Sequence, residues 1–155
     1  MSKQKKKSPG SIAANRRARF EFQIDQTHEA GIVLEGWEVK SIRDGRIQIT
    51  DSFVQIDKNE AYLHGATITP LLSASTHIHP DATRPRKLLL HRYELDRLIG
   101  AVERKGYAIV AMSMYWKMGN VKLEIGLGKG KKAHDKRATS KDRDWERQKE
   151  RLMKQ

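Results

Sequence analysis

Apolar and polar residues alternate with a period of two over several stretches of this chain, which is the pattern of half-buried β-strands. The alternation predicts strands at residues 18–24, 32–34, 47–56, 61–68, 108–116 and 121–127. Turn-forming residues separate the third strand from the fourth and the fifth from the sixth, so each of these pairs is expected to form a hairpin. The sheet predicted in this way is mostly antiparallel.

Helical spacing occurs at two places between these strands. Apolar residues at i, i+3, i+4 and i+7 predict an amphipathic helix that ends at Gly106; they are Leu95, Leu98, Ile99 and Val102. The run 87–90 is expected to lead into this helix. A short helix is expected over residues 36–45, because two apolar residues lie one turn apart and a glycine follows them. A chain too short for two stacked sheets removes its sheet edges by closing on itself. The pattern therefore favours a mostly β fold: a small closed or partly closed antiparallel barrel with one or two inserted helices.

Positive charge is concentrated at the two ends of the chain. Of the net charge of +12 over 155 residues, residues 1–19 carry +7, residues 20–127 carry −1 and residues 128–155 carry +6. This distribution predicts a disordered basic arm at 1–11, a folded RNA-binding domain at 12–127 and a basic tail at 128–155. Thr139 and Asp142 have the spacing of a helix capping box, and acidic residues precede basic ones after them. Because the tail has few apolar residues, we expect it to be disordered alone and helical when docked.

Composition narrows the possible functions. The chain has no cysteine, and no apolar run approaches the roughly 18 residues that span a bilayer. We therefore expect a cytoplasmic protein with no membrane association, and nucleic acid is favoured over an anionic lipid surface as its partner. The glycine-lysine run at 128–132 lacks the Ser or Thr of a phosphate-binding loop. The sequence shows no paired catalytic carboxylates, so no enzymatic activity, catalytic residue or cofactor is expected.

Several residues allow two interpretations. The tail is either a solubilising extension or an arm that folds on RNA, and Trp145 suits either base stacking or packing against protein. His77 and His79 have a spacing that a metal ion accepts, but two solvated histidines explain them better, so no metal site is expected. By spacing alone Glu29 fits the solvated surface as well as a contact to base N–H groups, and Leu89 fits the core.

Four segments appear in a distinctive order: EAGIVL at 29–34, GWEVKSIR at 36–43, RKLLL at 86–90 and GKKAHDKR at 130–137. Together they resemble the small protein B family, the SsrA-binding proteins of bacteria. The resemblance implies an oligonucleotide-binding-type barrel that grips the tRNA-like part of transfer-messenger RNA (tmRNA), with the protein in place of the missing anticodon arm. It also implies a tail that folds in the empty mRNA channel of a stalled ribosome, near the decoding centre, during trans-translation.

The resemblance also implies particular residues and partners. The RNA contacts of the family fall on Asn15, Glu29, Arg43 and Leu89, with Arg86 and Lys87 beside them as phosphate contacts. The ribosome-contacting tail falls on Gly130, Lys131, Lys132, His134, Asp135, Lys136, Arg137, Trp145, Leu152 and Met153. The expected partners are tmRNA, ribosomal RNA and, indirectly through the alanine-charged RNA, elongation factor Tu, and the protein is expected to be a monomer. The alternative is a basic ribosomal or assembly protein that binds ribosomal RNA through the same barrel.

Overall fold

The structure is a computed structural model that describes residues 10–72, 80–103, 106–131, 137, 143–149 and 151–152. Its strands are β1 (Ser11–Ala14), β2 (Phe22–Ile32), β3 (Ile47–Gln48), β4 (Phe53–Asp57), β5 (Glu60–His64), β6 (Thr67–Ile68), β7 (Arg86–Leu89), β8 (Tyr107–Lys117) and β9 (Asn120–Gly130). Its helices in the folded body are α1 (Ala18–Glu21), α2 (Gly36–Arg43) and α3 (Arg92–Val102).

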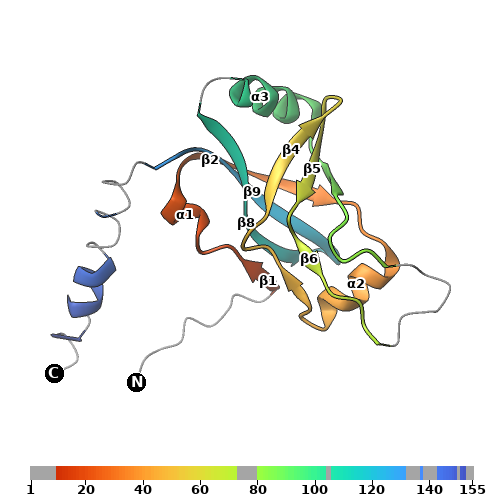
Figure 1. The fold of residues 1–155 in the computed structure, drawn as a ribbon, viewed down its shortest axis with the longest axis horizontal. Coiled ribbons are helices and arrows are strands. Elements are labelled where there is room, and N and C mark those ends of the chain that lie inside the picture. Colours follow the sequence, from red (N-terminus) through yellow and green to blue (C-terminus); the bar gives the residue numbers. More distant parts are fainter. Residues whose placement is uncertain are drawn as a thin grey trace.

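Six strands close into an antiparallel barrel (Figure 1). Their order is β8-β4-β5-β7-β2-β9, and β9 pairs again with β8 to complete the ring, while β1 adds to the outside of β8. Two strand pairs supply most of this pairing. In the long β8–β9 hairpin the register starts at Tyr107↔Lys129, and in the β2–β9 pair it starts at Phe22↔Gly130. Closure leaves few free strand edges in this chain, as the sequence pattern predicted.

The barrel is filled by the inward-facing residues of its strands. Leu63, Met114, Leu123 and Ile125 are fully buried, and Leu98 of α3 packs into the same cluster. In Figure 1, α3 lies over one end of the barrel, and α2 lies near the opposite end. Burial of these apolar side chains is the main source of stability for the body.

A second, smaller apolar cluster lies outside the barrel under α1. Ala18 of α1 is buried with Val110 and Met112, and Phe22 and Ile24 of β2 pack against them. A Cβ at Gly128 would lie 2.3 Å from the carbonyl oxygen of Gln23, so β2 and β9 approach this closely only because that position is glycine. The register of the two strands shifts at this point, between Ile24 and Gln26.

The fold confirms the predicted barrel, both predicted hairpins and the two predicted helices of the body. Several boundaries were wrong. Each strand of the first hairpin is interrupted, so 47–56 forms β3 and β4 and 61–68 forms β5 and β6, which pair as β4–β5 and β3–β6. The segment 18–24 begins as the one-turn helix α1, which covers the outer cluster, and β2 then runs without a break through Gly31 to Ile32, so there is no separate strand at 32–34. The run 87–90 is largely the barrel strand β7 and not a lead-in to α3, because it pairs with both β2 and β5. The helix α3 ends at Val102, and β9 extends to Gly130, three residues beyond the predicted strand.

The described part of the tail is helical and exposed. Residues 143–149 and 151–152 are helical, with Trp145 62% and Leu152 67% exposed. The helix approaches the body at Arg143, whose guanidinium lies over the Phe20 ring at 5.5 Å from its centroid. The tail helix is therefore not part of either apolar cluster.

Candidate RNA-binding surface

Glu29 lies on the outer face of β2 and is held there by two side chains from β8. The Tyr115 hydroxyl donates to Oε2 of Glu29 at 2.5 Å, and Lys117 Nζ lies 3.2 Å from Oε1. The hydrogen bond from Tyr115, followed by that from Lys117, lowers the pKa of Glu29 below its ordinary value. The side chain remains 38% exposed, so the ionised carboxylate is accessible to a ligand.

A cleft of about 410 Å³ opens beside Glu29, between β2, β7 and the end of the β8–β9 hairpin. Leu89 lines it and is 53% exposed. Gly31 lies opposite Leu89 in the β2–β7 register, and a Cβ there would stand only 3.2 Å from that of Leu89. The small residue therefore makes room for an apolar side chain that faces solvent.

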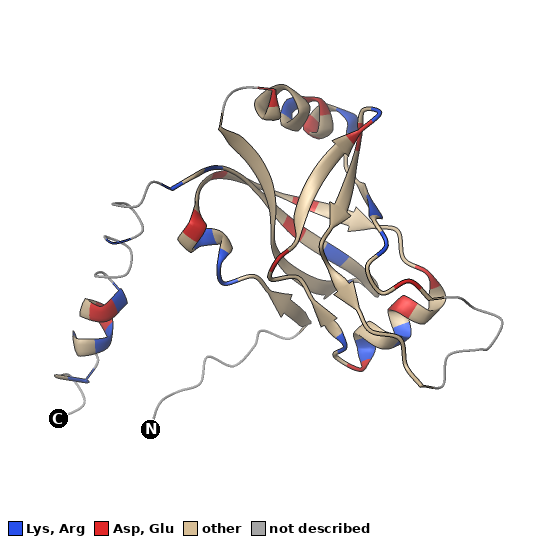
Figure 2. Ribbon diagram, viewed as in Figure 1, with Lys and Arg blue, Asp and Glu red and all other residues tan. Residues whose placement is uncertain are grey.

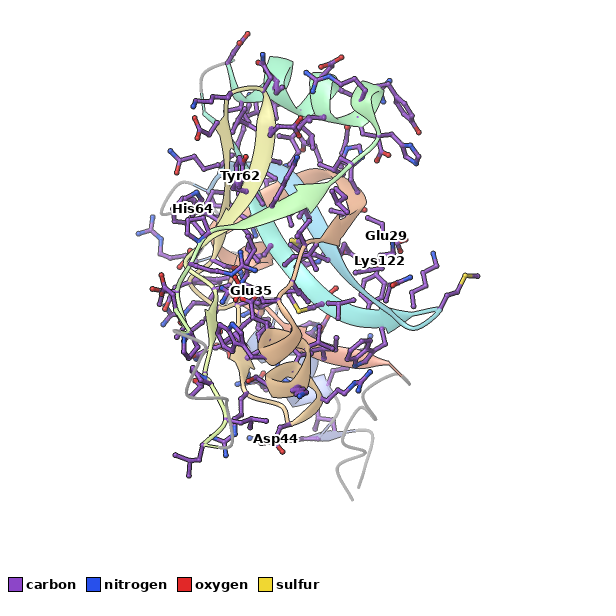
Figure 3. The ribbon with its side chains drawn as sticks, turned by 90° about the vertical axis from the view of Figure 1, so that its right-hand side faces the viewer. Glu29, Glu35, Asp44, Tyr62, His64 and Lys122 are labelled. Carbon is purple, nitrogen blue, oxygen red and sulfur yellow. The ribbon has the colours of Figure 1, made fainter. Side chains whose placement is uncertain are left out.

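One basic side chain lines this cleft, and another contacts an aromatic residue of its wall. Lys122 lies opposite Gly31 on β9, lines the cleft and acts electrostatically on Glu29, and Figure 3 shows Glu29 and Lys122 next to each other. Arg43, at the end of α2, places its guanidinium 5.8 Å from the ring centroid of Trp116, another cleft residue. An exposed apolar side chain, an ionised carboxylate and several cations together suit an unpaired base and its phosphates.

Three of the predicted RNA contacts thus lie on this surface: Glu29, Arg43 and Leu89. Lys87 lies on β7, two residues before Leu89, and is partly buried. Asn15 is only 7% exposed, and its amide donates to the backbone oxygen of Ala111 at 2.9 Å. Its position therefore indicates a structural role in joining β1 to β8.

Arg86 does not fit the predicted phosphate contact. It is fully buried, its Nε lies 2.5 Å from Glu38 Oε2, and its terminal nitrogens donate to the backbone oxygens of Ala66 and Ala82 at 3.1 Å. Arg84 also pairs with Glu38, which is itself fully buried. This cluster, which we call the Glu38 cluster (Glu38, Arg84 and Arg86), fastens α2 to β7 and to the segment before it.

Four residues of the surface were not predicted: Tyr115, Trp116, Lys117 and Lys122. Tyr115 lies within the predicted strand 108–116. The sequence did not show that it faces Glu29, 86 residues away. The contact depends on the register of β8 against β9 and of β9 against β2.

The predicted tail residues are spread over several environments. Gly130 lies at the end of β9, and the Lys131 backbone N–H donates to the Glu21 oxygen at 2.8 Å, so both belong to the edge of the barrel. Arg137, Trp145 and Leu152 are exposed, and Lys132, His134, Asp135, Lys136 and Met153 lie outside the described residues, as do His77 and His79.

A second cleft, of about 620 Å³, lies between the tail helix and the body. Arg143 and Arg147 line it against Asn15, Arg16 and Arg19. Figure 2 shows both signs of charge in the tail helix as well as over the barrel.

Within the described residues, no group of three or more His, Cys, Asp or Glu side chains is placed to hold a metal ion. In that same part of the chain, no helix combines the length and apolar character needed to cross a membrane. The features that remain are a closed barrel, a cationic surface around an exposed leucine, and a basic helical tail. These features define a class of RNA-binding β-barrel proteins.

Comparison with known proteins identifies the family within this class. The sequence model described as "SmpB protein" matches residues 12–155, so the chain belongs to the SmpB family. An SsrA-binding protein of Alkalilimnicola ehrlichii is 58% identical over 154 residues, covering 99% of this chain and 96% of the relative. Another from Psychrobacter sp. is 59% identical over 155 residues, covering 100% of this chain and 98% of the relative.

A solved structure agrees with the sequence matches. A chain from the work "tmRNA-SmpB: a journey to the center of the bacterial ribosome" superposes with a TM-score of 0.64 at 44% identity, and the match covers 79% of this chain and 86% of that chain. The identity is high enough for the likeness to extend beyond the fold alone. The family suggested by the four sequence segments is thereby confirmed.

Proposed function

We propose that this protein binds the tRNA-like domain of tmRNA and delivers it to stalled ribosomes for trans-translation. Membership of the SmpB family over nearly the whole chain is the observation that supports this most strongly. The surface around Glu29 and Leu89 supplies a matching recognition site, since sequence-specific RNA recognition uses unpaired bases rather than the narrow major groove of an RNA duplex. The protein acts by binding in the cytoplasm, and no bond-making step is assigned to it.

In this proposal the barrel and the tail have separate tasks. The barrel takes the place of an anticodon arm through the contacts of Glu29, Arg43, Lys87 and Leu89. The tail, with its basic residues 131–137 and the helix that contains Trp145, enters the empty mRNA channel near the decoding centre. Elongation factor Tu is an indirect partner through the alanine-charged RNA. The exposure of the described tail helix supports this division, because it leaves the helix's apolar side chains free to contact another surface.

The test of RNA recognition compares the tRNA-like domain of tmRNA with an unrelated RNA of equal length in a gel shift at two salt concentrations. Phosphate contacts weaken steeply with salt whereas base contacts do not, so the preference for the tRNA-like RNA should persist or grow at the higher salt concentration. Equal affinity for both RNAs would contradict the proposal. Stable co-sedimentation with empty ribosomal subunits in the absence of tmRNA would favour a ribosomal or assembly protein.

The test of the tail is a truncation after Lys131, which keeps all of β9 and the Lys131–Glu21 backbone hydrogen bond. The shortened protein should bind the tRNA-like RNA about as well as the full chain. Peptidyl transfer to alanyl-tmRNA on a stalled ribosome should be abolished. Full transfer by the truncated protein would show that the tail has no part in the mechanism.

A further inference from the structure

Tyr115 and Lys117 reach over a whole strand to contact Glu29. Glu29 lies on β2 and Tyr115 on β8, with β9 between them. Neighbouring strands are about 4.8 Å apart, so the two backbones are separated by roughly 10 Å across the sheet. Long side chains such as tyrosine and lysine close this distance, with the Tyr115 hydroxyl 2.5 Å from Oε2 and Lys117 Nζ 3.2 Å from Oε1.

These two contacts restrict an otherwise exposed glutamate. A free glutamate on a strand samples many rotamers and loses that freedom when a ligand binds it. Here the Tyr115 hydroxyl and the Lys117 ammonium fix the carboxylate before any ligand arrives, and both favour its ionised form. An ionised carboxylate accepts hydrogen bonds only, and with two oxygens it retains lone pairs for additional donors.

We propose that Tyr115 is a positioning residue for RNA recognition: its hydroxyl holds Glu29 as an ionised acceptor beside the Leu89 cleft, ready for an N–H group of an unpaired base. This inference rests on the proposed function and assigns a task to a residue that itself need not touch RNA. Leu89 supplies the apolar side of the site, and Lys122 supplies a cation for a neighbouring phosphate. Glu29 then selects unpaired bases that present an N–H donor on the edge that faces it.

Tyr115 is partly buried, which fits this role. Burial first, and the hydrogen bond to Glu29 second, raise the pKa of the Tyr115 phenol above its ordinary value. The phenol therefore keeps its proton over the working pH range and acts as a permanent donor. Lys117, the second partner, is 52% exposed, so solvent screens its interaction with Glu29 and Tyr115 is expected to dominate the positioning.

The test is Tyr115→Phe, which removes the hydroxyl and keeps the ring. Affinity for the tRNA-like domain of tmRNA should fall by about three- to tenfold, the range for one hydrogen bond. In a Glu29→Gln background the same substitution should have little further effect, because a residue that acts through Glu29 has nothing left to position. Tyr93→Phe is the matched control, since Tyr93 is exposed on α3 and should leave the affinity unchanged.

The pH profile separates positioning from a general structural role. In the wild-type protein, binding should weaken only where Glu29 takes up a proton, below its ordinary pKa of 4.5. Tyr115→Phe removes the largest cause of the lowered pKa, so this acid limb should move to higher pH. Two results would contradict the inference while the wild type still selects tmRNA. In the first, Tyr115→Phe leaves both the affinity and the acid limb unchanged; in the second, it weakens binding equally with and without Glu29. In either case the proposed function stands. If the wild type shows no selectivity, the proposed function itself fails.

Discussion

Glu38 and Glu29 are both held by cationic side chains, but only Glu29 faces solvent. Glu38 is fully buried and paired with Arg84 and Arg86, and it also accepts the Glu35 backbone N–H at the start of α2 at 2.7 Å. Glu29 is exposed on β2 and held by Tyr115 and Lys117. Both are ordered acceptors, but the partners of Glu38 occupy its oxygens inside the protein, whereas Glu29 keeps part of its surface open.

The difference shows that burial decides whether an ion-paired carboxylate stabilises the fold or is available to bind a ligand. In the Glu38 cluster each charge is compensated within the fold, and Arg86 also donates to the backbone oxygens of Ala66 and Ala82. Around Glu29 the cations Lys117 and Lys122 lie beside an open cleft, where phosphates can replace solvent. A substitution in the first region should therefore affect folding, and one in the second should affect binding.

The largest effect is expected for Glu38→Ala. The substitution leaves the buried Arg86 without its partner, and breaking a buried pair in this way costs about 3–5 kcal/mol in the free energy of unfolding. Chemical denaturation measures this loss. Glu29→Ala is the control and should change stability by less than about 0.5 kcal/mol, as exposed pairs do. A loss below about 1 kcal/mol for Glu38→Ala would remove the structural role from the cluster.

An intermediate effect is expected for Leu89→Ala, on RNA affinity rather than on stability. Removing an apolar side chain that becomes buried under a base should weaken binding to the tRNA-like domain by about tenfold, or roughly 1.4 kcal/mol. Unfolding should be little affected, because the side chain is half exposed in the free protein. Leu72→Ala, at a fully exposed leucine, provides the control. Unchanged affinity in the gel shift would exclude Leu89 from the site.

The smallest effect is the pH dependence of stability through Glu29. Because its pKa is lowered in the folded protein, ionised Glu29 contributes stability that is fully present above the unfolded-state pKa near 4.5 and is lost as the pH falls through the folded-state value. The stability difference between the wild type and Glu29→Gln should therefore shrink as the pH falls below 4.5. A difference that stays constant over this range would indicate that Tyr115 and Lys117 do not favour the ionised form.

The sequence predicted those parts of the fold that depend on local patterns. The β8–β9 hairpin and α3 follow directly from alternation and from helical spacing. The helix α1 was mistaken for a strand because Phe20, Phe22 and Ile24 alternate, whereas burial of Ala18 against Met112 favours a helical turn. The strand β7 was missed because its pairing with β2 and β5 is not visible locally.

The site was predicted less completely for the same reason. Family resemblance indicated Glu29 and Leu89, but the partners that give them their properties are distant in sequence. Arg86 and Glu38 are 48 residues apart, and nothing in the basic run at 86–87 distinguishes a buried arginine from a surface lysine. Contacts of this kind are set by the register of strands that meet only when the barrel closes.

The most direct measurement is the ratio of affinities for the tRNA-like domain of tmRNA and for an unrelated RNA of equal length, compared between the wild type and Glu29→Ala. The phosphate contacts of the basic residues remain in the variant, so its affinity for the unrelated RNA should be nearly unchanged while its preference for the tRNA-like RNA falls by about tenfold or more. An undiminished preference in the variant would show that recognition lies elsewhere on the molecule.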